Sequence, residues 1–329
     1  MNKRICVIGA GRWGKNHIRT LNEMGNLGGI VESDNIILNQ FLSKYNGVEG
    51  YAKMEDSFVD DYDGYVLATP ADTHFKIGKL ILEAKKNVLI EKPIALTSRE
   101  VRVLIDLSKE NHCQLMVGHL LLFHPAIIKL KQLINNGKIG KILYLYTTRL
   151  NFGTVRTREN VCFSLAPHDI SILNYLMDEL PTDIEAVGSC LLQKNIPDIV
   201  IANFTYESEI DAHVFVSWLH PFKEQRIIAI GDKGMLYFSD SGMDKNIYYY
   251  DKIIKWENGK PIKCDEGTEV IEYDKAEPLK NELEYFIKSI DDPQLKIADG
   301  KSGLEVIEIL EEITNKVSCN IEKEVEENE

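Results

Sequence analysis

Apolar residues in the first third of the chain alternate between two patterns. Short runs of consecutive apolar positions are typical of strands buried on both faces of a parallel sheet, and the segments between them carry apolar residues at helical spacing. Strands are expected at residues 4–8, 28–31, 64–68, 87–90 and 114–118. Helices are expected from Gly14 to Met24 and at residues 35–44, 73–84 and 98–110. This alternation predicts an α/β Rossmann unit, a doubly wound parallel sheet, over residues 1–118.

The pattern changes after Gly118 to closely spaced strands with fewer helices. Strands are expected at residues 142–150, 184–191, 199–206, 212–218, 225–231 and 235–238. Helices are expected at residues 125–135, 168–177, 278–289 and 300–317. Residues 119–317 are therefore expected to form an α+β domain with a largely antiparallel, open-faced sheet, followed by an acidic tail at 318–329.

Composition and charge narrow the class of protein. The 329 residues are 44% hydrophobic and 27% charged, which is typical of a soluble globular chain with a sizeable core. A net charge of −13 disfavours nucleic acid and anionic membranes as partners. The six cysteines show no CxxC spacing, and no segment approaches 18 uninterrupted apolar residues. We therefore expect a cytoplasmic protein with reduced thiols.

Three glycines form a dinucleotide-binding fingerprint. Gly9, Gly11 and Gly14 follow the first strand and open a helix, which is the context that the GxGxxG motif needs. Gly9 would permit the tight turn, Gly11 the approach of a pyrophosphate, and Gly14 close packing of helix on strand. Arg12 and Trp13 lie in the same turn and are assigned to the cofactor with it. A glycine turn without a ligand is the alternative.

An acidic residue at the end of the second strand indicates which cofactor is bound. Glu32 lies eighteen residues after Gly14, where a carboxylate can accept hydrogen bonds from the adenosine ribose and would repel a 2′-phosphate. Ser33 follows, and no basic residue occurs until Lys44. The sequence therefore favours NAD over NADP.

Two further loops follow expected strands, at the edge of the sheet where doubly wound folds bind ligands. One contains Thr69, Pro70 and His74, and the other is Glu91-Lys92-Pro93. Together with the glycine turn, these loops resemble those of the Gfo/Idh/MocA family of NAD(P)-dependent sugar dehydrogenases. The resemblance implies that both loops line the nicotinamide side of the cofactor, with Lys92 pointing at the substrate hydroxyl.

The second domain carries a further mark of this family, a histidine at the start of a helix. Here it is His168, preceded by Ala166-Pro167. Many family members have an aspartate four residues before that histidine, where this chain has Ser164, so a mechanism with two carboxyl groups is in doubt.

Residues 118–125, 148–153, 156–161 and 166–169 resemble a branch of the family that oxidises C3 of UDP-linked N-acetylated amino sugars. In that branch the ketone passes to a PLP aminotransferase that makes 2,3-diamino sugars, for lipopolysaccharide and lipid A. UDP-N-acetylglucosamine is the expected substrate. The substrate-binding residues implied are Lys92, His119, Arg149, Asn151, Arg156, Arg158, Asn160 and His168.

The chemistry of alcohol oxidation suggests roles for these side chains. His168 titrates near neutral pH and is assigned as the base, with Lys92 as a hydrogen-bond donor to the same oxygen, although the two roles are interchangeable. The guanidinium group of arginine can donate two hydrogen bonds to a phosphate, so Arg149, Arg156 and Arg158 are assigned to the diphosphate of the substrate. The alternative is that these arginines are solvated or paired with Glu159 or Asp169.

Other functions remain open at this stage. The substrate could instead be UDP-N-acetylglucosaminuronate, another sugar or a polyol, or a nucleotide-linked ketosugar that is reduced rather than oxidised. A non-catalytic NAD(H)-binding regulatory module is the alternative of a different class. No metal is expected, because His74, His119 and His124 lack metal-ligand spacing. The family resemblance implies a homodimer or homotetramer formed through the open sheet face.

Overall fold

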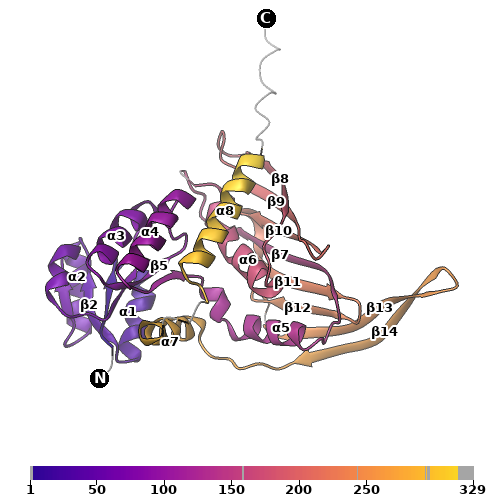
Figure 1. Ribbon diagram of the computed structural model, residues 1–329, viewed down its shortest axis with the longest axis horizontal. Helices are drawn as coiled ribbons and strands as arrows, with labels where there is room; N and C mark the ends of the chain where they lie inside the picture. Colours follow the sequence, from indigo (N-terminus) through magenta and orange to yellow (C-terminus); the bar gives the residue numbers. More distant parts are fainter. Residues whose placement is uncertain (1–2, 158, 243, 293, 295–296, 318–329) are drawn as a thin grey trace, which may run out of the picture. The chain divides into compact units, whose positions relative to one another are not determined.

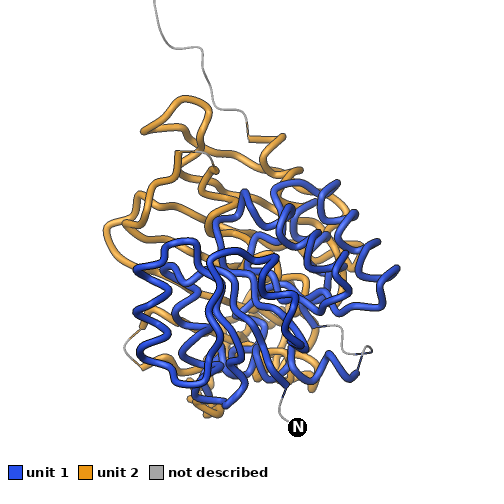
Figure 2. The backbone as a smooth tube through the Cα atoms, turned by 90° about the vertical axis from the view of Figure 1, so that its left-hand side faces the viewer, with its two compact units in different colours: residues 1–124, 276–308 blue, residues 125–275, 309–329 orange. Residues whose placement is uncertain are grey.

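The computed structural model describes residues 3–157, 159–242, 244–292, 294 and 297–317. The chain divides into two compact units, shown in blue and orange in Figure 2. Unit 1 comprises Met1–His124 and Ala276–Glu308, and unit 2 comprises Pro125–Lys275 and Ile309–Glu329. The segment Ala276–Glu308, which the sequence pattern groups with the second domain, thus belongs to the first unit.

Unit 1 is built on a six-stranded parallel sheet with the order β3-β2-β1-β4-β5-β6 (Figure 1). Its strands are β1 (Ile5–Ile8), β2 (Leu27–Val31), β3 (Glu49–Tyr51), β4 (Gly64–Leu67), β5 (Asn87–Glu91) and β6 (Leu115–Gly118). This is the strand order of dinucleotide-binding folds, in which ligands lie beyond the carboxyl ends of β1 and β4. The predicted doubly wound parallel sheet is confirmed, although β3 was not predicted.

Two of the helices of unit 1 begin at a short polar side chain that caps them. The helices of the unit are α1 (Gly14–Glu23), α2 (Asn35–Lys44), α3 (Ala71–Glu83), α4 (Ser98–Glu110) and α7 (Pro278–Asp291), with short 3-10 helices η1 (Met54–Val59) and η2 (Leu120–Phe123). Asp34 caps α2 by accepting a 2.8 Å hydrogen bond from the Ile36 N–H, and Thr97 caps α4 through the Glu100 N–H. These caps fix the starts of both helices.

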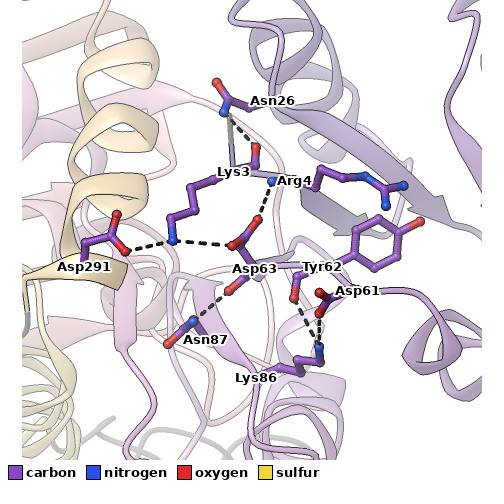
Figure 3. Close-up of polar contacts among 9 residues, drawn as sticks. All are labelled: Lys3, Arg4, Asn26, Asp61, Tyr62, Asp63, Lys86, Asn87 and Asp291. Carbon is purple, nitrogen blue, oxygen red and sulfur yellow. Dashed lines mark hydrogen bonds and ion pairs between the residues drawn. The ribbon is translucent and has the colours of Figure 1, made fainter. Parts of the chain in front are cut away.

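A polar cluster joins the amino ends of β1, β4 and β5 (Figure 3). The Asp63 carboxylate accepts a 2.7 Å hydrogen bond from the Arg4 N–H, and the Asn87 side chain donates to the main-chain oxygen of Asp63 at 2.7 Å. Lys3 forms ion pairs with Asp63 at 3.4 Å and with Asp291 of α7 at 2.8 Å. These contacts occupy the amino edge of the sheet, whereas the predicted site loops lie at the carboxyl edge.

Unit 2 is built on an eight-stranded sheet with the order β14-β13-β12-β11-β7-β10-β9-β8 (Figure 1). Its strands are β7 (Ile142–Phe152), β8 (Asp183–Ser189), β9 (Ile199–Thr205), β10 (Asp211–Ser217), β11 (Leu219–Gly231), β12 (Met235–Ser239), β13 (Ile247–Glu257) and β14 (Lys260–Ile271). Among the described strands of this sheet, β7 and β10 pair in parallel and the other neighbours pair antiparallel, so the predicted, largely antiparallel sheet is confirmed. The hairpin of β13 and β14 was not predicted.

Two helices of unit 2 precede and follow β7. They are α5 (Pro125–Asn135) and α6 (Val161–Met177), and α6 packs on β7, β9 and β10. The last helix, α8 (Gly300–Lys316), contains the boundary between the two units.

The cysteines only partly match the expectation of reduced thiols. Cys6, Cys113, Cys162 and Cys264 carry free thiols, whereas Cys190 is disulfide-bonded, so the expectation is wrong for Cys190. None of the helices in the described part of the chain is both long enough and apolar enough to span a membrane.

Candidate functional site

The turn after β1 depends on glycine at two positions. Gly9 has a φ of +92°, and a Cβ atom there would lie 2.9 Å from the main-chain oxygen of Ala68. A Cβ atom on Gly14 would lie 1.8 Å from the Gly9 oxygen, so α1 packs directly on the turn. A Cβ atom on Gly11 would meet nothing within 4 Å. The predicted turn and packing roles of Gly9 and Gly14 are confirmed, and Gly11 leaves room for an anion to approach the N–H groups that begin α1.

Glu32 lies directly after β2, with its carboxylate against the glycine turn. Its Oε2 accepts a 2.8 Å hydrogen bond from the Ala10 N–H. Its Oε1 accepts from the Asp34 N–H at 3.0 Å and from the Ser33 hydroxyl at 3.2 Å. Two carboxylate oxygens offer about four lone-pair positions, so acceptor capacity remains for ribose hydroxyls. The side chain is therefore fixed beside the glycine turn, with acceptor capacity to spare.

A buried histidine joins the two predicted nicotinamide loops. His74 is 1% exposed, and its ring nitrogens lie 2.9 Å from the Thr69 oxygen and 2.8 Å from the Pro93 oxygen. The Thr69 hydroxyl also forms a 2.6 Å hydrogen bond with that of Thr73, and Pro70 directly precedes α3. The structure thus brings Thr69, His74 and Pro93 together, with His74 as the link between the two loops.

Glu91, at the end of β5, is an anchor for α1 and for its own loop. It is 9% exposed and accepts hydrogen bonds from the Trp13 indole, from His17 at 2.7 Å and from the Lys92 N–H at 3.2 Å. Burial raises the pKa of Glu91, but the hydrogen bond and charge of His17, with the contributions of Trp13 and Lys92, outweigh burial and lower it overall. Glu91 is therefore ionised at neutral pH.

His17 is a site residue that the sequence reasoning missed. A signal was present, because His17 follows Trp13 by four positions on α1 and so lies on the same face of that helix. The rings of Trp13 and His17 are 6.1 Å apart in an edge-on arrangement. Trp13 itself is 39% exposed, and Arg12 is exposed beside it. Arg12 is therefore exposed at the glycine turn, whereas Trp13 and His17 connect this turn and α1 to Glu91.

His119 directly follows β6 and is buried near Lys92. Its side chain is 2% exposed, and within the described residues neither ring nitrogen has a hydrogen-bond partner. Burial, followed by the charge of Lys92, lowers the pKa of His119 to about 4. His119 is therefore neutral at physiological pH. The nearby Lys92 is half-buried.

In unit 2, His168 lies within α6 and not at its start. The helix begins at Val161, where Asn160 caps it by accepting a 3.0 Å hydrogen bond from the Phe163 N–H. The prediction of a helix starting at His168 is wrong, because the cap is at Asn160 and Pro167 lies inside the helix. Ser164 lies four residues before His168, one turn earlier on the same face.

Two asparagines predicted to bind substrate differ in their contacts. The side-chain oxygen of Asn160 caps α6, and its amide nitrogen donates a hydrogen bond to the Thr314 hydroxyl at 3.3 Å. The Oδ1 atom of Asn151, in β7, is buried without a hydrogen-bond partner in the described part of the chain. Asn151 is therefore better placed than Asn160 to receive a further donor.

Arg149 forms a buried ion pair with the residue next to His168. Its Nε lies 2.5 Å from Asp169 Oδ2, and its second donor reaches the other carboxylate oxygen at 3.3 Å. The two residues are 7% and 1% exposed. The alternative reading of Arg149, pairing with Asp169, is therefore the observed one, and it connects β7 to α6.

Arg156 is the exposed arginine of the predicted phosphate-binding set. Its side chain is 50% exposed and pairs with Glu159 at 3.2 Å. Such a surface ion pair contributes little to stability, so Arg156 could release Glu159 and bind a phosphate instead. Arg158 lies outside the described residues. Within those residues, no group of three or more His, Cys, Asp or Glu side chains could hold a metal ion.

Comparison with known families accounts for both units. The model of the oxidoreductase family with an NAD-binding Rossmann fold, Gfo/Idh/MocA, matches residues 3–119. The model of the GFO/IDH/MocA C-terminal domain matches residues 127–237. Together the two models cover more than half of the chain and include the glycine turn, the two predicted nicotinamide loops and His168.

Similar individual proteins act on more than one class of substrate. UDP-N-acetylglucosamine 3-dehydrogenase from Acidithiobacillus ferrooxidans is 26% identical in sequence over 93% of this chain and 95% of its own. The solved structure of the same enzyme matches with a TM-score of 0.84 and 23% identity, and the match covers 96% of this chain and 98% of the other. Myo-inositol 2-dehydrogenase from Thermotoga maritima is 26% identical over 92% of this chain and 93% of its own. The WlbA dehydrogenase from Bordetella pertussis, in complex with NADH and UDP-GlcNAcA, matches with a TM-score of 0.77 over 96% of both chains, at 19% identity.

Proposed function

Because this chain belongs to the Gfo/Idh/MocA family of oxidoreductases, we propose that it is an NAD-dependent dehydrogenase of a UDP-N-acetylhexosamine. The reaction would oxidise the C3 hydroxyl of UDP-N-acetylglucosamine to the 3-keto sugar. The observation that carries this proposal is the similarity to a UDP-N-acetylglucosamine 3-dehydrogenase, which extends over 93% of the chain and thus over both units.

The residues of unit 1 fit NAD. The open space at Gly11, the exposed start of α1 and the carboxylate of Glu32 suit a pyrophosphate and an unphosphorylated ribose. Thr69 and Pro93, held by His74, would line the nicotinamide. When bound, NAD supplies the carbon that accepts a hydride from the substrate.

Lys92 and His168 are the residues that we assign to the substrate hydroxyl. The hydroxyl proton must leave as the C–H hydride is transferred, and His168 is assigned as its acceptor. Lys92 would donate a hydrogen bond to the same oxygen and stabilise the negative charge that develops on it. Its main chain is tied to Glu91, which fixes the position of the loop.

Oxidation of a polyol is the second candidate, and it is favoured by the similarity to a myo-inositol 2-dehydrogenase over 92% of the chain. A polyol has no diphosphate and needs no exposed arginine. Because Arg149 is paired in the protein interior, Arg156 is the described arginine of the predicted set that remains at the surface. Recognition of UDP therefore distinguishes the two candidates.

Arg156→Ala is expected to weaken UDP binding about 10- to 100-fold, because one charge-assisted hydrogen bond contributes about 1.5–3 kcal/mol. Calorimetric titration of the protein–NADH complex with UDP measures this effect. Lys260→Ala, in exposed β14, removes the same charge elsewhere in unit 2 and serves as the control. Equal UDP affinity in wild type, Arg156→Ala and Lys260→Ala would favour a polyol as the substrate. So would binding of myo-inositol without binding of UDP.

We also propose a homodimer or homotetramer formed through the outer face of the unit 2 sheet. Aromatic side chains gather there: Tyr146 stacks on His213 with ring centroids 4.7 Å apart, and the Tyr144 hydroxyl lies 2.7 Å from His213 Nδ1. Ile201 and Val187 continue this face and are 37% and 65% exposed. A second copy of the sheet would cover these side chains. A PLP aminotransferase would consume the ketone, and neither nucleic acid nor membrane is proposed as a partner.

A further inference from the structure

His74 has a hydrogen-bond acceptor at each of its two ring nitrogens. The side chain is buried in the first turn of α3. Its Nδ1 lies 2.8 Å from the main-chain oxygen of Pro93, and its Nε2 lies 2.9 Å from the main-chain oxygen of Thr69. Both distances are those of ordinary N–H···O hydrogen bonds. Each ring nitrogen therefore faces a carbonyl group, which can only accept.

The protonation state of the ring follows from these two contacts. A neutral imidazole carries one N–H and one lone pair, so it donates one hydrogen bond and accepts another. A carbonyl oxygen has no hydrogen to donate, and its lone pairs would repel the lone pair of an unprotonated ring nitrogen at this distance. Both contacts of His74 are hydrogen bonds only when both nitrogens carry hydrogen, as they do in the imidazolium ion.

Two other buried histidines of unit 1 have different surroundings. His17 directs Nε2 at the carboxylate of Glu91, and its Nδ1 has no partner among the described residues. In the same part of the chain, neither ring nitrogen of His119 has a partner. A neutral ring is compatible with both of these arrangements. The surroundings of His74 differ from them, because acceptors occupy both sides of its ring.

The two carbonyl oxygens also offset the cost of a buried cation. Burial removes a charge from water, and the dipole of α3 disfavours a positive charge in the first turn of the helix. Hydrogen bonds from a charged donor are stronger than those between neutral groups. The oxygens of Thr69 and Pro93 therefore stabilise the charged form of His74, and the charged ring in turn holds their two loops together.

We propose that His74 is a buried imidazolium whose charge makes the site prefer the uncharged nicotinamide of NADH to the cationic ring of NAD. The inference rests on the proposed function, because it takes Thr69 and Pro93 to line the nicotinamide. His74 acts through these two loops and through its charge, so it is a positioning residue and not a catalytic one.

A fixed positive charge behind the loops favours oxidation of the alcohol. The hydride carries two electrons from the substrate carbon to the nicotinamide ring, which thereby loses its positive charge, and the hydroxyl proton leaves to the assigned base. The charge of His74 raises the free energy of the cationic ring and not that of the neutral ring. It therefore shifts the equilibrium on the enzyme toward NADH and the ketone.

Nitrogen NMR of the full chain with isotope-labelled histidine, recorded without cofactor, tests the protonation state. A neutral ring shows one protonated and one unprotonated nitrogen at well-separated shifts, whereas an imidazolium shows two protonated nitrogens. The His74 signals are those that disappear in His74→Gln. At about pH 7 an ordinary histidine is mostly neutral, whereas His74 should show two protonated nitrogens. An unprotonated nitrogen in His74 would overturn the proposal.

Affinities for NAD and NADH test the effect on the cofactor site. His74→Gln keeps a donor for one of the two oxygens but removes the charge. The preference for NADH over NAD should fall by about 3- to 30-fold, the effect of one unit charge at the effective dielectric of a protein site. Affinity for ADP-ribose, which lacks the nicotinamide, should stay at the wild-type value. Loosened loops alone would weaken NAD and NADH equally, so an unchanged preference would overturn the proposed effect of the charge.

His112→Gln is the matched control, because it makes the same substitution at an exposed position of unit 1. Its preference for NADH should equal that of wild type. His74→Asn, which has a shorter side chain of the same chemistry, replaces His74→Gln in both experiments should the latter not fold. Failure of the wild-type protein to bind NADH would contradict the proposed function, whereas the NMR spectrum would still decide the charge of His74.

Discussion

Replacing Lys92 by methionine is expected to lower kcat/KM for the sugar nucleotide by about 10²- to 10⁴-fold, because proton transfer and charge stabilisation at the reacting oxygen contribute effects of that size. Methionine preserves the length of the side chain but cannot donate a hydrogen bond. The Lys92 main-chain N–H donates to Glu91, and this hydrogen bond does not depend on the side chain, so the loop should keep its position. NADH affinity should therefore remain close to that of wild type.

His168→Asn is the companion variant, since asparagine keeps polarity but does not accept a proton near neutral pH. Initial rates with saturating NAD measure turnover in both variants, and fluorescence titration with NADH shows whether the cofactor site is intact. Unchanged kcat/KM in both variants would contradict the assigned roles. Loss of NADH binding in step with activity would indicate a structural effect of the substitution.

Asp169→Ala is expected to destabilise the protein by about 3–5 kcal/mol, because it leaves Arg149 with a buried and unpaired charge. Both side chains are almost fully buried, and Arg149 meets the carboxylate with two donors. The pair also connects β7 to α6, the helix that carries His168. Turnover should fall together with stability, since His168 is adjacent to the substituted residue.

Glu159→Ala provides a matched comparison for that prediction. It removes the carboxylate partner of a different arginine, Arg156, in a pair whose side chains are 50% and 23% exposed. Surface pairs contribute about 0–1 kcal/mol, so this variant should unfold at nearly the same urea concentration as wild type. Equal destabilisation by Asp169→Ala and Glu159→Ala would show that the buried pair of Arg149 and Asp169 contributes no more to stability than a surface pair.

The sequence predicted best those elements whose ends are marked by local chemistry. The bounds of α2 and α4 agree with the prediction, because Asp34 and Thr97 cap these helices and apolar residues recur along one face. The start of α6 was missed because Pro167 is typical of a first helical turn, whereas here it lies in the interior of the helix. Strands β13 and β14 were missed because much of their hairpin is exposed, so no apolar face marks it.

The same distinction holds for the candidate site. The glycine turn was readable because its geometry is local and needs glycine at Gly9 and Gly14. The partner of Arg149 could not be selected, because Asp169 lies on another element and competes in the sequence with Glu159. The sequence placed His74 in its loop but could not predict its contact with the Pro93 oxygen, because that oxygen belongs to the loop after another strand.

The measurement that tests the proposed function most directly is NADH formation from NAD with a panel of substrates. The panel contains UDP-N-acetylglucosamine, UDP-N-acetylgalactosamine, UDP-N-acetylglucosaminuronate and myo-inositol, with an aminotransferase and glutamate present to remove the ketone. We expect NADH to form with UDP-N-acetylglucosamine and not with myo-inositol. NADH formed only with myo-inositol, or with no member of the panel in protein that binds NADH, would contradict the proposed function.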